Sequence, residues 1–456
     1  MNKTIHRLLA LFSGRNVHTP SASGSSLVAG LSLLALCVSA QAQVSESYTF
    51  TTNRVLPDGN AAGLADVRTL DSAITSVASV TAHLKIAGEF NGDVYAYLAH
   101  SDGFCVLLNR VGRTAKNGAG YADHGFDVSF TLAAENGDIH QYQDITALKP
   151  GQPLTGFWQP DGRSADPAEV TEASPRENSL KNFLGLNAAG DWTLYLVDLE
   201  TGGTNQLTEW GLEISGIATP GLVWTNPATI TYGTALGIAQ LNATATYNGT
   251  NVPGKWVYSP DFGTVLNAGA SQSLSVTFTP TDSDSFHPIS GSVLLEVSPA
   301  PLTIVANSAS KAYGAALPEM VARYEGFVNG DDTNHLTALA KLTTTATALS
   351  DVGVYPINVG DARSDNYSFQ YMSGFLTITQ ALTVARIVSS TEQAAPGAKV
   401  AFTAHIAAVA PGAGTPSGKV KFLIDGTEAS TEALSDGAAT FTIDQLSHGV
   451  HVVAIE

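Results

Sequence analysis

Residues 190–216, GDWTLYLVDLETGGTNQLTEWGLEISG, decide the fold of the N-terminal part of the chain. Leucine and tryptophan side chains alternate with their neighbours over 192–197, which is the period of a β-strand. A loop of Gly, Thr and Asn follows, and an apolar run resumes at 207–214. Trp192 and Trp210 would bury large areas at inner positions, so we expect this stretch to be the closing hairpin of a β-domain core.

The same stretch resembles the end of the P/Homo B domain, the β-sandwich that follows the catalytic domain in subtilisin-like proprotein convertases. The positions that carry the resemblance are Gly190, Trp192, Leu194, Leu196, Asp198, Gly202, Leu207, Trp210 and Leu212. Residues 86–112 resemble the central strands of that family. The resemblance covers residues 46–217 and implies a jelly-roll-like β-sandwich with, at most, a supporting role beside a catalytic partner.

Composition favours several small β-domains over one large core. The chain has 456 residues, 43 Gly and 20 Pro, and only 14% of its residues are charged. The net charge of −18 argues against binding to nucleic acid or to an anionic membrane surface. It suits an extracellular protein, either with a merely solubilising acidic surface or with sites for Ca²⁺.

Residues 1–42 have the pattern of an export signal. A basic segment precedes the apolar run 27–38, which is too short to span a bilayer stably, and Ala40-Gln41-Ala42 is a small-x-small cleavage site. An uncleaved membrane anchor is the alternative. Cys37 lies in the segment that would be removed, so Cys105 would be left alone, and its apolar neighbours favour a small buried hydrophobe over a nucleophile.

The remainder of the chain divides into three units of short strands separated by short linkers. Residues 222–298 predict a small antiparallel sandwich that resembles a bacterial immunoglobulin-like repeat. Residues 301–380, with Lys311-Ala312-Tyr313-Gly314, resemble the MBG repeat of bacterial surface proteins. Residues 381–456 resemble a further immunoglobulin-like repeat that stops within or just after a strand. The sequence thus predicts an all-β protein, a P-domain-like sandwich followed by a stalk of immunoglobulin-like sandwiches.

Catalytic motifs are the first thing that the P-domain resemblance requires testing. The sequence has no Gly-Thr-Ser-Met-Ala, His-Gly-Thr-His or Gly-x-Ser-x-Gly motif, and about 45 residues precede the P-like unit, too few for a catalytic domain. We therefore predict that the chain is not an enzyme, although the resemblance itself suggests association with a serine endopeptidase.

The sequence also lacks common metal-binding motifs: it contains no His-Glu-x-x-His, no Cys-x-x-Cys and no EF-hand loop. Acidic residues do flank the expected strands, and oxygen-rich loops can bind Ca²⁺. The candidate calcium ligands are Asp93, Asp102, Asp123, Asp127, Asp191 and Asp198; plain turn formation is the competing interpretation. The histidines His83, His100, His124 and His140 lack ligand spacing and are expected to be surface or strand residues.

Three functions remain open. The leading hypothesis is a non-catalytic, exported protein of the bacterial surface that binds a protein or carbohydrate through the P-like unit. The second is an accessory part of a secreted subtilisin-like protease whose catalytic domain lies elsewhere. The third is a structural role in an autotransporter passenger or an envelope protein, anchored through a region beyond Glu456.

Overall fold

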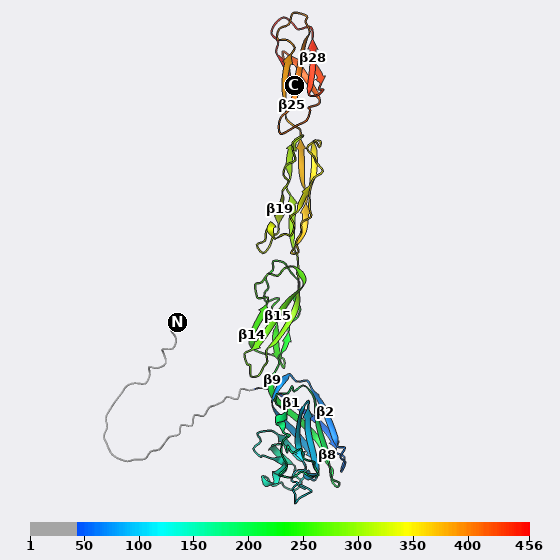
Figure 1. Ribbon diagram of the computed structural model, residues 1–456, viewed down its shortest axis with the longest axis vertical. Helices are drawn as coiled ribbons and strands as arrows, with labels where there is room; N and C mark the ends of the chain where they lie inside the picture. The colour runs from blue at the N-terminus through cyan, green and yellow to red at the C-terminus, as the bar shows by residue number, and fades with distance from the viewer. Residues whose placement is uncertain (1–42) are drawn as a thin grey trace, which may run out of the picture. The chain divides into compact units, whose positions relative to one another are not determined.

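The computed structural model describes residues 43–456, and these residues fold almost entirely into β-strands. The predicted all-β series of sandwiches is confirmed (Figure 1). The predicted signal, its cleavage site and Cys37 lie outside the described residues. The described part of the chain contains no helix with the length and apolar character needed to cross a bilayer.

The first sandwich, residues 44–218, has two sheets. One has the order β1-β9-β3-β6-β7 and the other the order β2-β8-β4-β5. The strands of the first sheet are β1 (Val44–Val55), β9 (Gln206–Ala218), β3 (Ile74–Ala87), β6 (Phe126–Phe130) and β7 (Leu154–Trp158). Those of the second are β2 (Leu64–Leu70), β8 (Gly190–Asp198), β4 (Val94–His100) and β5 (Gly103–Asn109). Three short 3₁₀ helices, η1 (Asn91–Asp93), η2 (Ile139–Asp144) and η3 (Leu180–Phe183), lie in the connections.

Both tryptophans of the deciding stretch lie in the core between these sheets, as predicted. Trp192 is 0% exposed and Trp210 is 1% exposed, because each occupies an inward position of its alternating strand. The expected hairpin is wrong, however: β8 pairs with β2 and β4, whereas β9 pairs with β1 and β3. The loop between them therefore carries the chain from one sheet to the other, and the two tryptophans enter the core from opposite sheets.

Asn91-Gly92-Asp93 is a sequence typical of a hairpin turn, but it forms no hairpin, for the same reason. β3 belongs to the first sheet and β4 to the second, so residues 91–93 form a 3₁₀ turn between layers. Phe90 enters this turn in the left-handed region with a φ of 60°, a strained value for a large side chain. Strand periodicity alone shows inward and outward faces but does not show which strands are neighbours.

The second sandwich contains the sheets β10-β12-β13 and β11-β16-β15-β14. Its strands are β10 (Gly221–Val223), β11 (Ile230–Thr231), β12 (Thr244–Tyr247), β13 (Thr250–Asn251), β14 (Gly254–Ser259), β15 (Gly269–Pro280) and β16 (Ile289–Ser298). Its strand pairs are antiparallel, as predicted, except that β11 pairs with β16 in parallel through Ile230 and Val297. A two-residue strand is too short for the sequence to reveal its direction.

The third sandwich contains the sheets β19-β17-β22 and β18-β23-β21-β20. Its elements are β17 (Ala300–Ala306), β18 (Ala309–Ala312), β19 (Ala322–Glu325), η4 (Thr333–His335), β20 (Lys341–Thr343), β21 (Gly353–Gly360), β22 (Tyr367–Met372) and β23 (Gly374–Thr379). Lys311 of the Lys-Ala-Tyr-Gly motif is buried, and its ammonium donates to the carbonyls of Ala315 (3.1 Å) and Ala348 (2.9 Å). The motif lysine thus holds loop backbone in place.

The fourth sandwich contains the sheets β24-β25-β28 and β27-β26-β29. Its strands are β24 (Thr383–Ser389), β25 (Val400–Ala408), β26 (Lys419–Ile424), β27 (Thr427–Ala433), β28 (Ala438–Ile443) and β29 (Val453–Ile455). Asp425 and Gly426, a pair typical of tight hairpins, form the turn between β26 and β27 with φ values of 54° and 82°.

Candidate functional site

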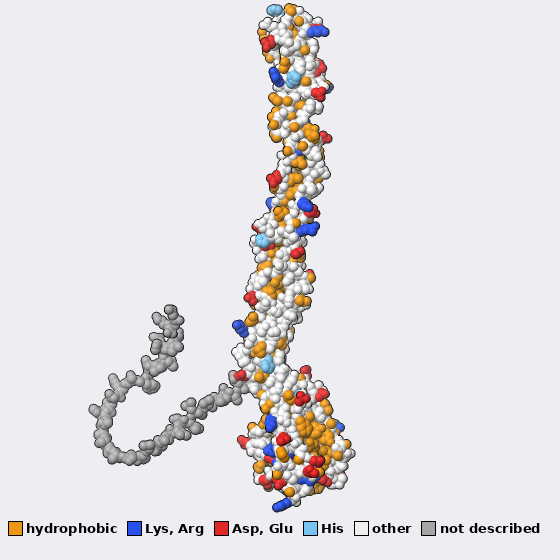
Figure 2. Space-filling view, in the orientation of Figure 1, with side chains coloured by type: hydrophobic (Ala, Val, Ile, Leu, Met, Phe, Trp, Pro, Cys, Tyr) orange, Lys and Arg blue, Asp and Glu red, His pale blue; other side chains and the backbone are white. Residues whose placement is uncertain are grey.

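One outer face of the first sandwich is apolar and aromatic. Figure 2 shows hydrophobic side chains gathered over the strands that Figure 1 labels β2 and β8. The outward positions of this sheet place Val67 on β2, Tyr195 on β8, Tyr95 and Tyr97 on β4, and Phe104 on β5. Alternation forces these side chains outward, because their sequence neighbours fill the core. We call this set of five residues the aromatic face.

The rings of the aromatic face contact one another across neighbouring strands. Tyr97 stacks on Tyr195 with centroids 4.9 Å apart and planes 19° apart, and Phe104 lies 4.9 Å from Tyr97 on its other side. Burial raises the pKa of Tyr95 to about 12 and also raises the pKa of Tyr195, so these two phenols carry no charge at neutral pH. Val67 at the margin is 53% exposed. The face thus offers other molecules an uncharged surface.

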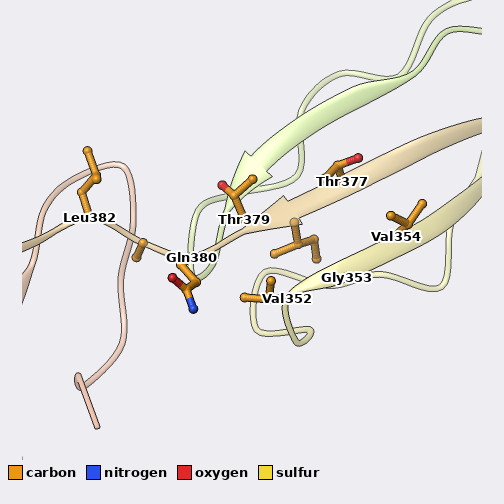
Figure 3. Close-up of a pocket in the computed structure, with 9 residues that line it drawn as sticks. Val352, Gly353, Val354, Thr377, Thr379, Gln380 and Leu382 are labelled. Carbon is orange, nitrogen blue, oxygen red and sulfur yellow. The ribbon is translucent and has the colours of Figure 1, made fainter. Parts of the chain in front are cut away.

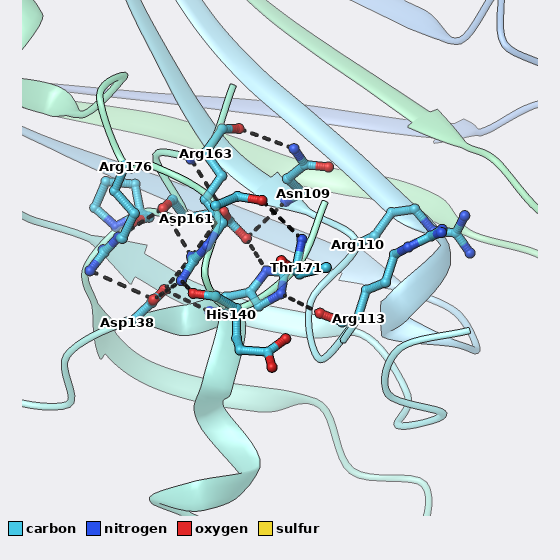
Figure 4. A network of polar contacts seen from close by, with 12 residues as sticks. Asn109, Arg110, Arg113, Asp138, His140, Asp161, Arg163, Thr171 and Arg176 are labelled. Carbon is cyan, nitrogen blue, oxygen red and sulfur yellow. Dashed lines mark hydrogen bonds and ion pairs between the residues drawn. The ribbon is translucent and has the colours of Figure 1, made fainter. Parts of the chain in front are cut away.

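A buried polar network lies at the end of the same sandwich, between η2 and the irregular segment after β7 (Figure 4). Asp161, 0% exposed, accepts hydrogen bonds from His140 Nδ1 (2.7 Å) and Arg163 Nη1 (3.2 Å). Arg163 Nη2 also donates to Asp138 (2.6 Å), and Arg176 Nη1 lies 3.7 Å from the same carboxylate. Buried charges are stable only when paired in this way.

His140 is 0% exposed and has an acceptor at each ring nitrogen. Nδ1 faces the Asp161 carboxylate at 2.7 Å, and Nε2 faces the carbonyl of Arg113 at 2.9 Å. Burial alone lowers the pKa of His140, but the carboxylate of Asp161 and the Arg113 carbonyl outweigh burial and raise the pKa above the ordinary value. A buried His–Asp pair suggests acid–base chemistry, yet both ring nitrogens here are occupied and sealed from solvent.

The sequence prediction for the histidines is therefore only partly right. His83 and His124 are exposed, as predicted. His100 is a strand residue, but it is buried, stacks on Trp192 at 4.2 Å, and faces the carbonyls of Asn187 and Asp191. The prediction for His140 is wrong, because it lies in a buried turn. Its partner Asp161 is distant in sequence, so local spacing held no signal for the pair.

The six candidate calcium ligands do not form one site. Asp102 is exposed on the turn after β4, and Asp127 forms an ion pair with Lys85 at 3.0 Å. Asp123 accepts from the Tyr142 hydroxyl (2.8 Å). Asp191 accepts from the hydroxyl of Thr69, the residue opposite it on β2. Each of the last three carboxylates already has a protein partner.

Asp93 and Asp198 are the two candidates that the fold brings together. Burial raises the pKa of Asp93 to about 6, and the nearby Asp198 carboxylate adds to the shift. Asp198 Oδ2 accepts from Asn205 Nδ2 at 3.0 Å, whereas Arg110 Nη2 lies 3.9 Å from Asp93. Within residues 43–456, no group of three or more His, Cys, Asp or Glu side chains is placed to hold a metal ion. Calcium binding stays a prediction.

Cys105 and one hollow of the repeats were the remaining candidates for a reactive or binding site. Cys105 is 0% exposed, and burial raises the pKa of its thiol far above the ordinary value, which agrees with the predicted structural role. The hollow, of about 600 Å³, lies at one end of the third sandwich (Figure 3). Its lining includes Val352, Val354 and Leu382, and it contains no ionisable side chain.

Comparison with known proteins identifies one domain of the chain. Residues 302–377 match the family model described as MBG domain (YGX type), which confirms the predicted MBG repeat. The match covers the third sandwich and does not assign the rest of the chain. No curated protein matches the sequence. The P/Homo B resemblance of residues 46–217 stays a prediction.

Similar solved structures are distant. The serine protease of Aeromonas sobria is 12% identical with a TM-score of 0.21, over 38% of this chain and 26% of that chain. Its complex with the chaperone ORF2 gives 14% identity and a TM-score of 0.19 over the same shares. Surface layer protein SbsC, domains 1–6, is 12% identical with a TM-score of 0.16, over 59% of this chain and 45% of that chain. The chain thus spans about a quarter of the protease and under half of SbsC, and likenesses this weak carry no argument.

Proposed function

We propose that this chain is a non-catalytic, exported surface or secreted protein whose first sandwich binds an extracellular partner. The observation that carries the proposal is the aromatic face, which leaves stacked tyrosines on the outside of a sheet in a protein of net charge −18. The stacked rings favour a partner whose own contact surface is uncharged, either protein or carbohydrate. The MBG domain supports a surface protein, since the MBG repeat is a module of bacterial surface proteins.

A charge placed on the aromatic face tests the proposal. Val67 is 53% exposed, so Val67→Asp should fold normally while it introduces a desolvated carboxylate into any contact. Val257 of the second sandwich is 52% exposed on β14, and Val257→Asp is the matched control. Residues 43–456 and both variants would be applied to arrays of extracellular proteins and neutral polysaccharides.

Binding that Val67→Asp reduces at least about tenfold and Val257→Asp leaves unchanged would support the proposal, since about 1.4 kcal/mol corresponds to a factor of ten. Binding that both variants retain would place the contact elsewhere. Absence of binding on every array would contradict a role in adhesion.

An accessory role in a secreted serine endopeptidase system is the second candidate. The specific observation in its favour is the P-domain-like pattern of 190–212, whose tryptophans fill the core of the first sandwich. A supporting domain of this kind would stabilise a catalytic domain on another chain or in another region. Increased activity or thermal half-life of a co-expressed subtilisin-like protease would support this role, whereas no change would oppose it.

A further inference from the structure

The edge of the second sheet of the first sandwich is covered by an irregular segment. β5 is the last strand in the order β2-β8-β4-β5. Residues 159–178, which we call the edge cover, hydrogen-bond to β5 near both of their ends. The amide of Asp161 donates to the carbonyl of Leu107 (3.0 Å), and the amide of Val106 donates to the carbonyl of Asn178 (3.0 Å). Covering an edge in this way prevents it from pairing with a strand of another chain.

Buried ions anchor the N-terminal end of the edge cover. Asp161 of the edge cover accepts from His140 Nδ1 (2.7 Å), from Arg163 Nη1 (3.2 Å) and from the amide of Asn109 on β5 (3.3 Å). Arg163 Nε and Asn109 Oδ1 are buried with no hydrogen-bond partner within the described residues. The anchor is therefore incompletely satisfied already, and the loss of one more hydrogen bond would be costly.

The geometry around His140 requires two ring protons. A carboxylate and a backbone carbonyl can only accept hydrogen bonds, and a neutral imidazole has one N–H. With Asp161 at one nitrogen and the Arg113 carbonyl at the other, only the imidazolium form satisfies both contacts. A neutral ring would direct a nitrogen lone pair at an oxygen lone pair inside the protein.

We infer that His140 is a proton-dependent latch, which in its imidazolium form fastens the edge cover over β5 and on losing its proton releases it. The charged group against the imidazole is Asp161, and Arg163 pairs with Asp161. Asp138 pairs with Arg163 and lies near Arg176, whereas Arg113 meets the ring through its backbone carbonyl. Arg163 pairs with both carboxylates, at 2.6 Å and 3.2 Å. The ring proton is thus held by two well-placed acceptors and not by an excess of negative charge.

The pH at which the latch opens follows from the sign of the shift. The pKa of His140 is raised in the fold above its usual value of 6.5, so the stabilisation is fully present below about that pH and is lost as pH rises through the folded-state pKa. Asp93 also favours acid, since its raised pKa of about 6 removes stability as pH rises from about 4 to 6. Global stability alone cannot separate the two groups, and the test must be local.

Hydrogen exchange measured by mass spectrometry on residues 43–456 gives that local signal. Protection factors, corrected for the intrinsic pH dependence of exchange, would be compared between pH 5.5 and pH 8.5. The latch predicts that peptides from β5 and the edge cover lose protection between these two pH values. The loss should be about tenfold for each unit by which the fold raises the pKa of His140, while peptides from β9 keep their protection. Equal protection at both pH values would overturn the inference.

His140→Gln removes the titrating group and should abolish the pH dependence of the edge cover. The control is His83→Gln, because His83 is exposed on β3 and one of its ring nitrogens hydrogen-bonds the Ser129 hydroxyl. That control should keep the wild-type pH dependence. Persistence of the dependence in His140→Gln, or its loss in His83→Gln, would contradict the latch.

A measurement on the unaltered protein covers the case in which His140→Gln does not fold. The NMR titration of the His140 ring reports proton loss directly, and its midpoint should coincide with the pH at which the edge cover loses protection. A midpoint displaced from that pH by more than about one unit, a tenfold difference in proton affinity, would overturn the inference.

Discussion

The first sandwich and the three that follow differ in the side chains that fill their cores. Of the largest fully buried side chains among the described residues, all but Phe278 and Phe422 lie in the first sandwich. The buried charged side chains of residues 43–456 also lie there, apart from Lys311. A small sandwich has few inward positions and cannot surround a charged pair, whereas a domain of about 170 residues can. Buried polar networks therefore mark the domain in which we place function.

The largest expected effect that tests this comparison is the loss of a core tryptophan. Trp192 is 0% exposed and packs against His100 and Phe183, so Trp192→Ala should cost about 3–5 kcal/mol of the stability of the first sandwich. Denaturant unfolding followed by hydrogen exchange would measure the loss domain by domain. Unchanged unfolding together with lost binding would show that this tryptophan serves recognition rather than packing.

A smaller loss is expected from the core of a repeat. Leu376 on β23 is 1% exposed in a small cluster, and Leu376→Ala should cost about 2 kcal/mol, the low end for such changes, because a thin core can collapse around the gap. Phe375, the next residue, is 54% exposed and supplies the control Phe375→Ala. If Leu376→Ala lowered the free energy of unfolding as much as Trp192→Ala does, the cores of the first and third sandwiches would not differ in the way that we describe.

The smallest effect is expected from a surface ion pair on the first sandwich. Lys85 Nζ lies 3.0 Å from Asp127 Oδ2, and each side chain is about half exposed, at 52% and 51%. Water and salt screen such a pair, so Lys85→Ala should leave the melting temperature of the first sandwich unchanged within error. A clear drop would show that this domain depends on its surface charges as well as on its buried ones.

Strand positions in the first sandwich followed from sequence, but strand partners did not. The alternation over 192–197 correctly placed Trp192 inward in β8, and the apolar run after it correctly placed Trp210. The same patterns suggested a hairpin where the chain crosses between sheets. Periodicity reports which face of a strand is buried, whereas pairing depends on which other strand completes the backbone hydrogen bonds.

The candidate site shows the same division. Tyr95, Tyr97 and Tyr195 alternate along the sequence with apolar residues that are buried. The stacking of Tyr97 on Tyr195 nevertheless required β4 and β8 to be neighbours. The acidic candidates were chosen for their places beside strand ends, and the fold brought only Asp93 and Asp198 together. The signal that the sequence did contain for the edge cover was its unusual length without regular structure.

By itself the sequence determined an all-β chain of several small units, an MBG repeat and a tryptophan core, because composition, turn residues and alternation are local properties. Only the tertiary structure showed that His140 and Asp161 form a buried pair and that residues 159–178 cover the edge of β5. Those contacts join segments whose proximity depends on how two sheets stack. The protonation of His140 and the covering of β5 both depend on that stacking, so no local sequence pattern predicts them.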